Sequence, residues 1–477
     1  VHDGRLYSLN TVSSPIEADM RNYVTTAKFN VSRMLPLPFS ARLMAGVDYS
    51  ENERKTRSET RTWSFRPTFA AGSPERLVGS YDLINEGYYQ RRTFNNGVRV
   101  RWIDPRKIYA LYQANPSWFV LNESAYYISQ VNGAQQLEET VTAGYLRGDL
   151  KFFDNRLWLV GGVRYERTED EGAGGRNDIR ATYQQDAQGN LIRNAAGQPI
   201  RVSTDALTLA RLQYTPFGTR AQSSYGDFYP SMNASYSFRE DFVARFGYAR
   251  TIGRPNLNFI IPSISIADPA AADTNRVIDV TNTGLKPWHA DNFDLSFESY
   301  GVRGATAAVS LFRKKISGFF VSTRSDATAS LLDQIGLSDD YLDYDVVTTT
   351  NSGDIVYVSG LEWSWRQSLK SFSNLPTWSR GLQFWVNGTH LRLSGAGQDN
   401  FSPWVPRILN WGASFATDRF VMKYNVNLMG LWRASVSPAS ATLPAGTFNG
   451  EDERKIQDGS IEYRLDKRFA LFAAVRN

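Results

Sequence analysis

A run of carboxylates stands out among the residues that could do chemistry. Asp339, Asp340, Asp343 and Asp345 fall within seven consecutive positions. Clustered carboxylate oxygens are ligands that Ca²⁺ takes, but the run lacks the glycine and the terminal glutamate of a calcium-binding loop. The spacing leaves two interpretations, a calcium site and a solvated acidic loop, and it favours the solvated loop.

Aromatic residues form a second group of candidates. They occur in two polar segments between hydrophobic stretches, and their rings could stack on sugar rings or on aromatic siderophores. We predict a ligand-binding role for Trp102, Trp118, Tyr126, Tyr127, Tyr341 and Tyr344. The alternative interpretation is that these rings pack the loops against one another.

Catalytic chemistry has little support in the sequence. The three histidines, His2, His289 and His390, are widely dispersed, and the chain has no cysteine. The absence of cysteine removes disulfides, thiolate metal sites and cysteine nucleophiles together. We therefore expect no enzymatic activity, no catalytic or metal site and no cofactor.

The basic residues do not form a nucleic-acid surface. Lys and Arg exceed Asp and Glu by 53 − 48 = 5. Many basic residues, such as Arg147 and Lys151, fall at alternating positions of predicted strands instead of clustering as they would on a nucleic-acid-binding face. We expect no nucleic-acid partner.

The elements that must position these residues show a period of two. In one stretch Phe293, Leu295 and Phe297 alternate with Asp294, Ser296 and Glu298. A β-strand separates these two sets onto opposite faces, whereas a helix cannot. In a transmembrane β-barrel one such face meets lipid and the other faces the lumen.

Composition agrees with a barrel. No window holds the roughly 20 successive apolar residues that a membrane helix needs. Aromatic residues reach 13% of the chain, as expected where girdles form at both membrane interfaces. The sequence predicts an all-β protein, a transmembrane antiparallel β-barrel with long extracellular loops; a large soluble β-protein with an aromatic core is the alternative.

Fourteen strands can be placed from the alternation. They are predicted near residues 22–34, 38–64, 143–154, 156–170, 224–239, 241–252, 290–301, 303–323, 354–371, 380–394, 407–418, 420–434, 454–466 and 468–477. Short turns alternate with long links at about 65–142, 171–223, 253–289, 324–353, 395–406 and 435–453. Because barrels of this kind have short periplasmic turns and long extracellular loops, the long links are assigned to the outside.

Several segments resemble one family of barrels. The run 229–257, YPSMNASYSFREDFVARFGYARTIGRPNL, is similar to a pair of strands in TonB-dependent receptors. Four further stretches resemble family segments in the same order: NRLWLVGGVRYERT (155–168), GLKPWHADNFDLSFESY (284–300), VSGLEWSW (358–365) and RFALFAAVRN (468–477).

The resemblance implies a larger architecture than the fourteen strands. Receptors of this family have a barrel of about 22 strands, plugged by an N-terminal domain. Residues 1–477 are therefore expected to be a partial barrel, with the plug domain, the first strands and the last strand not present in this chain. We expect roughly 150 or more upstream residues to form the plug.

The resemblance also implies a function and a location. It predicts an active transporter in the outer membrane of a Gram-negative bacterium, importing a scarce, bulky nutrient such as a siderophore or an oligosaccharide. The implied partners are the TonB complex, acting through the plug, the lipid and lipopolysaccharide of the membrane, the nutrient ligand and a possible surface lipoprotein. A passive porin is the alternative, and a barrel enzyme ranks third because the histidines are scattered.

Overall fold

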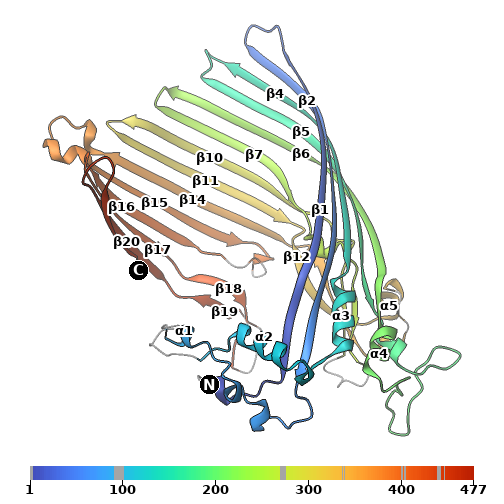
Figure 1. The fold of residues 1–477 in the computed structure, drawn as a ribbon. Helices are drawn as coiled ribbons and strands as arrows, with labels where there is room; N and C mark the ends of the chain where they lie inside the picture. The colour runs from blue at the N-terminus through green and yellow to red at the C-terminus, as the bar shows by residue number, and fades with distance from the viewer. Residues whose placement is uncertain are drawn as a thin grey trace.

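The computed structural model describes residues 4–90, 101–268, 276–335, 337, 339–398, 401, 404–437, 442–444 and 446–476. Long antiparallel strands form one curved sheet, and helices and short strands gather at one end of it (Figure 1). None of the described helices combines the length and the apolar character needed to cross a membrane.

The main sheet contains the fourteen predicted strands, each paired with the next in chain order. They are β1 (Thr11–Met34), β2 (Ser40–Phe65), β4 (Gln135–Phe152), β5 (Leu157–Asn177), β6 (Tyr214–Arg239), β7 (Phe242–Gly253), β10 (Trp288–Val302), β11 (Ala305–Ser317), β14 (Ile355–Ser368), β15 (Leu382–Ser394), β16 (Arg407–Ala416), β17 (Phe420–Met429), β20 (Arg454–Arg464) and β21 (Ala470–Arg476). A short strand, β3 (Phe119–Leu121), adds to β2. Within the described residues β1 and β21 end the path without pairing to each other, so the barrel is open there.

Two of the predicted strands each divide into two shorter strands in the structure. The segment 303–323 divides at Gly318, whose φ of 70° turns the chain, into β11 and a separate strand β12 (Phe320–Asp326). The segment 420–434 likewise divides at Gly430 into β17 and β18 (Trp432–Val436), which pairs with β19 (Phe448–Glu451). Other strands are longer than predicted, because polar residues continue the hydrogen-bonded ladder past the apolar region.

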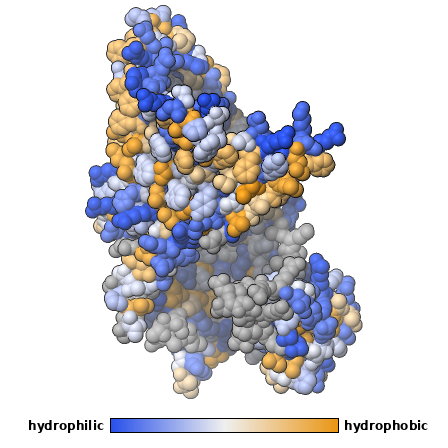
Figure 2. Space-filling model, turned by 90° about the vertical axis from the view of Figure 1, so that its left-hand side faces the viewer, coloured by the Kyte–Doolittle hydropathy of each residue, from blue (hydrophilic) through white to orange (hydrophobic). Residues whose placement is uncertain are grey.

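Strand register separates the two faces as the alternation predicts. One row across four strands joins Phe246, Leu295, Leu311 and Leu361. The adjacent row, on the opposite face, joins Arg245, Ser296, Ser310 and Glu362. The apolar face is the lipid-facing side of a barrel wall, and apolar side chains are visible over the strand-bearing upper part of Figure 2.

The lipid-facing band ends at a level marked by aromatic rings. On β2 the outward residues change from Val47 and Tyr49 to Glu51, and on β5 they change from Tyr165 to Arg167. Tyrosines at this level form the interfacial girdle expected of such barrels. The parts of β1, β2, β4, β5 and β6 beyond it are therefore an extension of the wall outside the membrane.

Three outer loops fold together into one body, here called the loop body. It comprises the described residues between β5 and β6, between β7 and β10, and between β11 and β14. A four-stranded sheet has the order β12, β13 (Asp345–Asn351), β9 (Val277–Val280), β8 (Ile264–Ile266). With η5 (Ile179–Thr182), α5 (Ala329–Gln334) and η8 (Asp339–Tyr341), these strands surround a buried cluster of Ile179, Tyr183, Ile266, Ile278, Ala327, Leu332, Tyr341, Tyr344 and Val346. Helix α4 (Ala206–Gln213) precedes β6 in the first of these loops.

The first outer loop packs on the ends of β1 and β2. It carries α1 (Glu86–Tyr89), α2 (Pro105–Ala114) and α3 (Glu123–Gly133), with a separate core around Phe65, Val78, Leu83, Ile84 and Phe119. Helix α3 lies against β2 so closely that a Cβ at Gly133 would collide with the Ser58 carbonyl. Its N-terminus is capped by Asn122, whose Oδ1 accepts from the Ala125 amide at 3.0 Å.

Two adjacent substitutions on β10 test which face of the sheet meets lipid and which faces the lumen. We expect Leu295→Arg to destabilise the membrane-inserted barrel by about 2–4 kcal/mol, because the arginine must lie in hydrocarbon. Ser296→Arg, one residue away on the lumen face, should cost far less. Urea unfolding in lipid bilayers measures both variants, and equal losses of stability would contradict the assignment of faces.

Candidate functional site

A polar cavity lies in the loop body, beside the outer ends of β5 and β6. It has a volume of about 720 Å³, within the size range of small-molecule sites. Its walls carry polar groups from Arg176, Asn177, Asp178, Arg180, Gln185, Gln188, Asn190, Thr219, Asp339 and Asp340. Its apolar part comes from Ile264, Ile266, Ile335 and Leu337. We call this cavity the loop pocket.

Hydrogen-bonded turns hold one wall of the loop pocket. The segment 186–202 is a meander with two tight turns. In the first turn the amides of Gln188 and Asn190 both donate to Asp186 Oδ1 at 2.9 Å. In the second, the amides of Ala196 and Gln198 donate to Asn194 Oδ1. Asp and Asn form such turns because their side chains bond to the backbone a few residues on.

Ion pairs neutralise the arginines of the loop pocket. Arg176 Nη2 lies 2.7 Å from Asp178 Oδ2, and Arg180 Nη2 lies 2.5 Å from Asp340 Oδ2. Arg180 also donates to the Gly189 carbonyl. The pocket therefore offers paired charges and amide groups, a surface suited to a polar ligand.

Three carboxylates of the acidic run form ion pairs with arginines elsewhere in the chain. Asp340 pairs with Arg180, Asp343 pairs with Arg276, and Asp345 pairs with Arg324. Across the described ranges, no three His, Cys, Asp or Glu side chains are grouped so that they could hold a metal ion. Asp340 and Asp343 thus join their loop to the other two loops, whereas Asp345 pairs within its own loop, between β12 and β13. These ion pairs explain why an acidic run lies in a folded region.

Two of the predicted ligand-binding aromatics lie in the core of the loop body. Tyr341 and Tyr344 are 2% and 3% exposed, and their rings meet edge to face at 5.2 Å. The Tyr344 hydroxyl donates to the Ala267 carbonyl at 3.2 Å, and burial raises its pKa to about 12. Only Tyr341 also borders the loop pocket. This packing favours the alternative interpretation, in which the two rings pack the loops against one another. Their role in ligand binding stays a prediction.

The other four predicted ligand-binding aromatics belong to the first outer loop, whereas Tyr341 and Tyr344 belong to the loop body. The Trp118 ring packs on Tyr81 at 5.6 Å under the Arg66 guanidinium, and Trp102 is half exposed beside Tyr88. On α3, Tyr126 accepts a long hydrogen bond from Arg61 and Tyr127 donates to the Tyr214 carbonyl at 3.0 Å. Their ligand role also stays a prediction.

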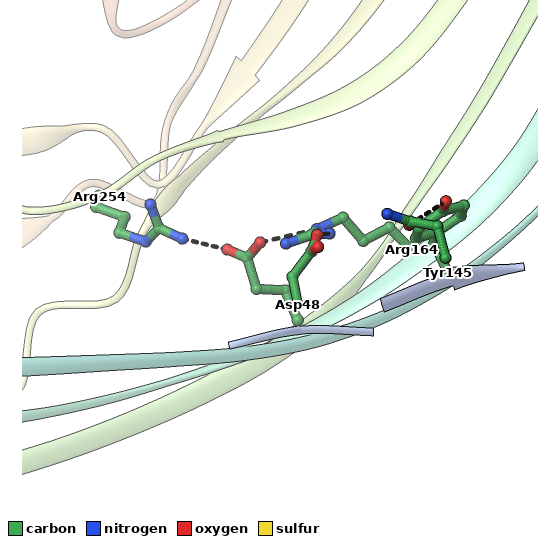
Figure 3. Close-up of polar contacts among 6 residues, drawn as sticks. Asp48, Tyr145, Arg164 and Arg254 are labelled. Atoms are coloured by element: carbon green, nitrogen blue, oxygen red, sulfur yellow. Dashed lines mark hydrogen bonds and ion pairs between the residues drawn. The ribbon is translucent and has the colours of Figure 1, made fainter. Parts of the chain in front are cut away.

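The lumen face of β1, β2, β4 and β5 carries a connected polar network (Figure 3). Arg164 Nη1 lies 2.5 Å from Asp48 Oδ2, and Arg164 Nε lies 3.0 Å from Glu166 Oε2. Glu166 also pairs with Arg254, which follows β7. Beside them the Tyr145 hydroxyl donates to Asn30 Oδ1 at 2.6 Å. The network gives the inner wall the polar lining that a hydrated passage requires.

The histidines show no convergence on a reactive centre. His289 begins β10 and lies 3.1 Å from Asp227, whereas His390 lies on β15, with β11 and β14 in between. His2 lies outside the described residues.

Sequence reasoning singled out three residues that line the loop pocket, Asp339, Asp340 and Tyr341, but missed the others. Arg176, Arg180 and Asp178 lie in a segment read only as a long link. The one local signal was the pair of turn motifs at 186–190 and 194–198, which mark a structured loop.

Comparison with known proteins gives a consistent result. A family profile described as "TonB dependent receptor-like, beta-barrel" matches residues 3–477. No curated protein matches the sequence significantly.

Several solved structures are similar to this chain. The unliganded ferric citrate transporter FecA aligns with a TM-score of 0.52 at 12% identity, covering 96% of this chain and 50% of that one. The ferric-catecholate import receptor Fiu from K12 E. coli aligns with a TM-score of 0.46 at 14% identity, covering 96% and 51%. The ferric enterobactin receptor PfeA from Pseudomonas aeruginosa gives 0.45 at 16% identity, covering 92% and 57%. The chain thus spans about half the length of the structures it matches.

Proposed function

The chain belongs to the family of TonB-dependent receptor-like β-barrels, whose members are outer-membrane proteins of Gram-negative bacteria, and we propose that it serves active import of a bulky polar nutrient. The observation that carries the proposal is the loop body. Three outer loops share one hydrophobic core and enclose a polar cavity of about 720 Å³ above a polar inner wall. A pore that only sieved small solutes would not need a folded body of this size at its mouth.

The loop pocket and the polar inner wall have different proposed roles. The loop pocket captures the nutrient outside the membrane, and the wall network of Asp48, Arg164 and Glu166 lines the route inward. The cargo class we propose is a siderophore, an oligosaccharide or a nutrient of similar size. Transport, rather than catalysis, is the proposed activity.

The proposed partners come from the family. The TonB complex supplies energy through a plug domain, and membrane lipid and lipopolysaccharide surround the apolar face. A surface lipoprotein that covers the loop body is a further candidate partner.

The capture role can be tested at the rim of the loop pocket. Asp339 is exposed on the pocket wall, and Asp333, in α5 of the same loop, is exposed and outside that wall. We expect Asp339→Lys to weaken binding of the transported nutrient at least tenfold, about 1.4 kcal/mol, through lost contacts and a reversed charge. Equilibrium binding to intact cells measures the effect. Asp333→Lys serves as the matched control, and equal affinities for the two variants would count against capture in this pocket.

A further inference from the structure

The segment that follows β7 lies across the lumen face of the wall. We call residues Arg254–Pro262 the strap. The Thr219 hydroxyl of β6 donates to the Pro262 carbonyl at 2.9 Å. On β5, a Cβ at Gly172 would collide with the Ile260 carbonyl, and a Cβ at Gly174 would crowd the Ile261 side chain. The two glycines therefore let the strap lie directly on the strand.

The strap also reaches the neighbouring strands. A small cavity is enclosed by Asn258 and Ile261 of the strap together with Arg54 of β2 and Leu137 of β4. Ile260 is 6% exposed, and Arg254 pairs with Glu166 at the start of the strap (Figure 3). The strap is thus a packed part of the inner wall, held at its first residue by an ion pair.

Buried polar groups lie on the same face of β5 and β6, next to the glycines. Thr168 and Asp170 are 1% and 5% exposed, and the register places them opposite Tyr225 and Ser223. Thr168 lies beside the Tyr225 hydroxyl, and Asp170 lies beside Ser223. A buried carboxyl is costly in its charged form, so the charge of Asp170 depends on what covers it.

The charges around Asp170 favour its neutral form. These residues lie in the extension of the wall, beyond the lipid-facing band. Burial, with a smaller contribution from Glu139 directly opposite on β4, raises the pKa of Asp170 to about 7. Arg254 of the strap and a hydrogen bond from Ser223 act in the opposite direction but are outweighed, and Arg254 also pairs with Glu166. Tyr225 on β6 adds no charge, because tyrosine is uncharged at neutral pH and burial raises its pKa further.

We propose that the strap is a proton-controlled element of the lumen, docked on the wall while the Asp170 carboxyl is neutral and loosened when that carboxyl ionises. The strap covers the face that carries Asp170, so its docking is what removes the carboxyl from water. Release of the strap exposes the carboxyl and lets it ionise at its ordinary pKa. Docking and proton binding are therefore linked.

The sign of the pH effect follows from this linkage. The docked state binds the proton more tightly than the released state, so docking is favoured at low pH. This advantage is lost as the pH rises toward about 7, the pKa of the docked Asp170. Between the ordinary pKa of a free aspartate, about 4, and the pKa of the docked carboxyl, the docking constant changes by roughly tenfold per pH unit.

Cysteine accessibility measures docking without knowledge of the cargo. Residues 1–477 contain no cysteine, so Ile260→Cys introduces the one thiol of this part of the receptor, at a buried position of the strap. A membrane-impermeant maleimide applied to intact cells labels this thiol when the strap is released. The rate is divided by that of Ala187→Cys, an exposed position in the loop body, which cancels the intrinsic pH dependence of the thiol.

We expect the normalised labelling rate to rise roughly tenfold between pH 5.5 and pH 7 and to level off above it. Adding Asp170→Asn, which mimics the neutral carboxyl, should give slow labelling at every pH. Adding Glu139→Gln should move the rise to lower pH, and adding Gly172→Ala should give fast labelling throughout by displacing the strap. A flat profile for the parent protein, or an unchanged profile with Asp170→Asn, would overturn the proposal. Ala187→Cys labelling in each background confirms that the variants reach the surface.

Discussion

Replacing Leu332 with aspartate is expected to unfold the loop body and to reduce nutrient uptake to near background while the barrel stays assembled. Leu332 has no exposed surface and lies in the core shared by the three loops. Truncating such a residue to alanine costs about 2–5 kcal/mol, and burying an unpaired carboxylate costs more. A small core of this kind does not tolerate that loss, so the walls of the loop pocket separate.

Limited proteolysis of intact cells and uptake assays check this prediction together. The unfolded loops should be cut by trypsin, whereas heat-modifiable migration of the barrel should be unchanged. Leu342→Asp is the matched control, because Leu342 belongs to the same loop and is 49% exposed. Normal uptake by the Leu332→Asp variant would show that the folded loop body is not needed for capture.

The wall of the barrel could be predicted because its signal is local. A period of two places Leu295 and Ser296 on opposite faces whatever the rest of the chain does, and register then follows from short turns. All fourteen predicted strands are present in the main sheet. Their outer ends were misjudged because outside the membrane both faces are polar or glycine-rich, as at Gly172 and Gly174, and the alternation disappears.

The loop body could not be predicted in the same way. Its core joins Ile179, Ile278 and Leu332, which come from three loops separated by long stretches of chain. No window of sequence contains this contact pattern. The acidic run shows the same limit, since its partners Arg180, Arg276 and Arg324 lie in three different segments.

The candidate site was predicted only in outline. The positions of the long links and their polar character were expected from the sequence, but the aromatic residues proposed for ligand binding do not meet at one site. Tyr341 and Tyr344 lie in a polar loop segment of the sequence, yet both are buried in the core of the loop body. Their burial could not be predicted because it depends on residues that other loops place over them.

Energy-coupled uptake is the central expectation of the proposed function. In the proposed receptor a plug domain occludes the lumen, so a bulky solute would not cross it at a useful rate by diffusion alone and its entry should need the TonB complex. We expect uptake to fall to background when TonB is deleted, whereas binding at the cell surface should persist.

The most direct measurement is accumulation of the nutrient whose use requires this receptor, compared in otherwise identical cells with and without TonB. Surface binding, measured in the same cells in the cold, separates capture from import. Import that depends on both the receptor and TonB is the predicted result. Import that continues at the same rate without TonB would contradict active transport and identify the barrel as a passive channel.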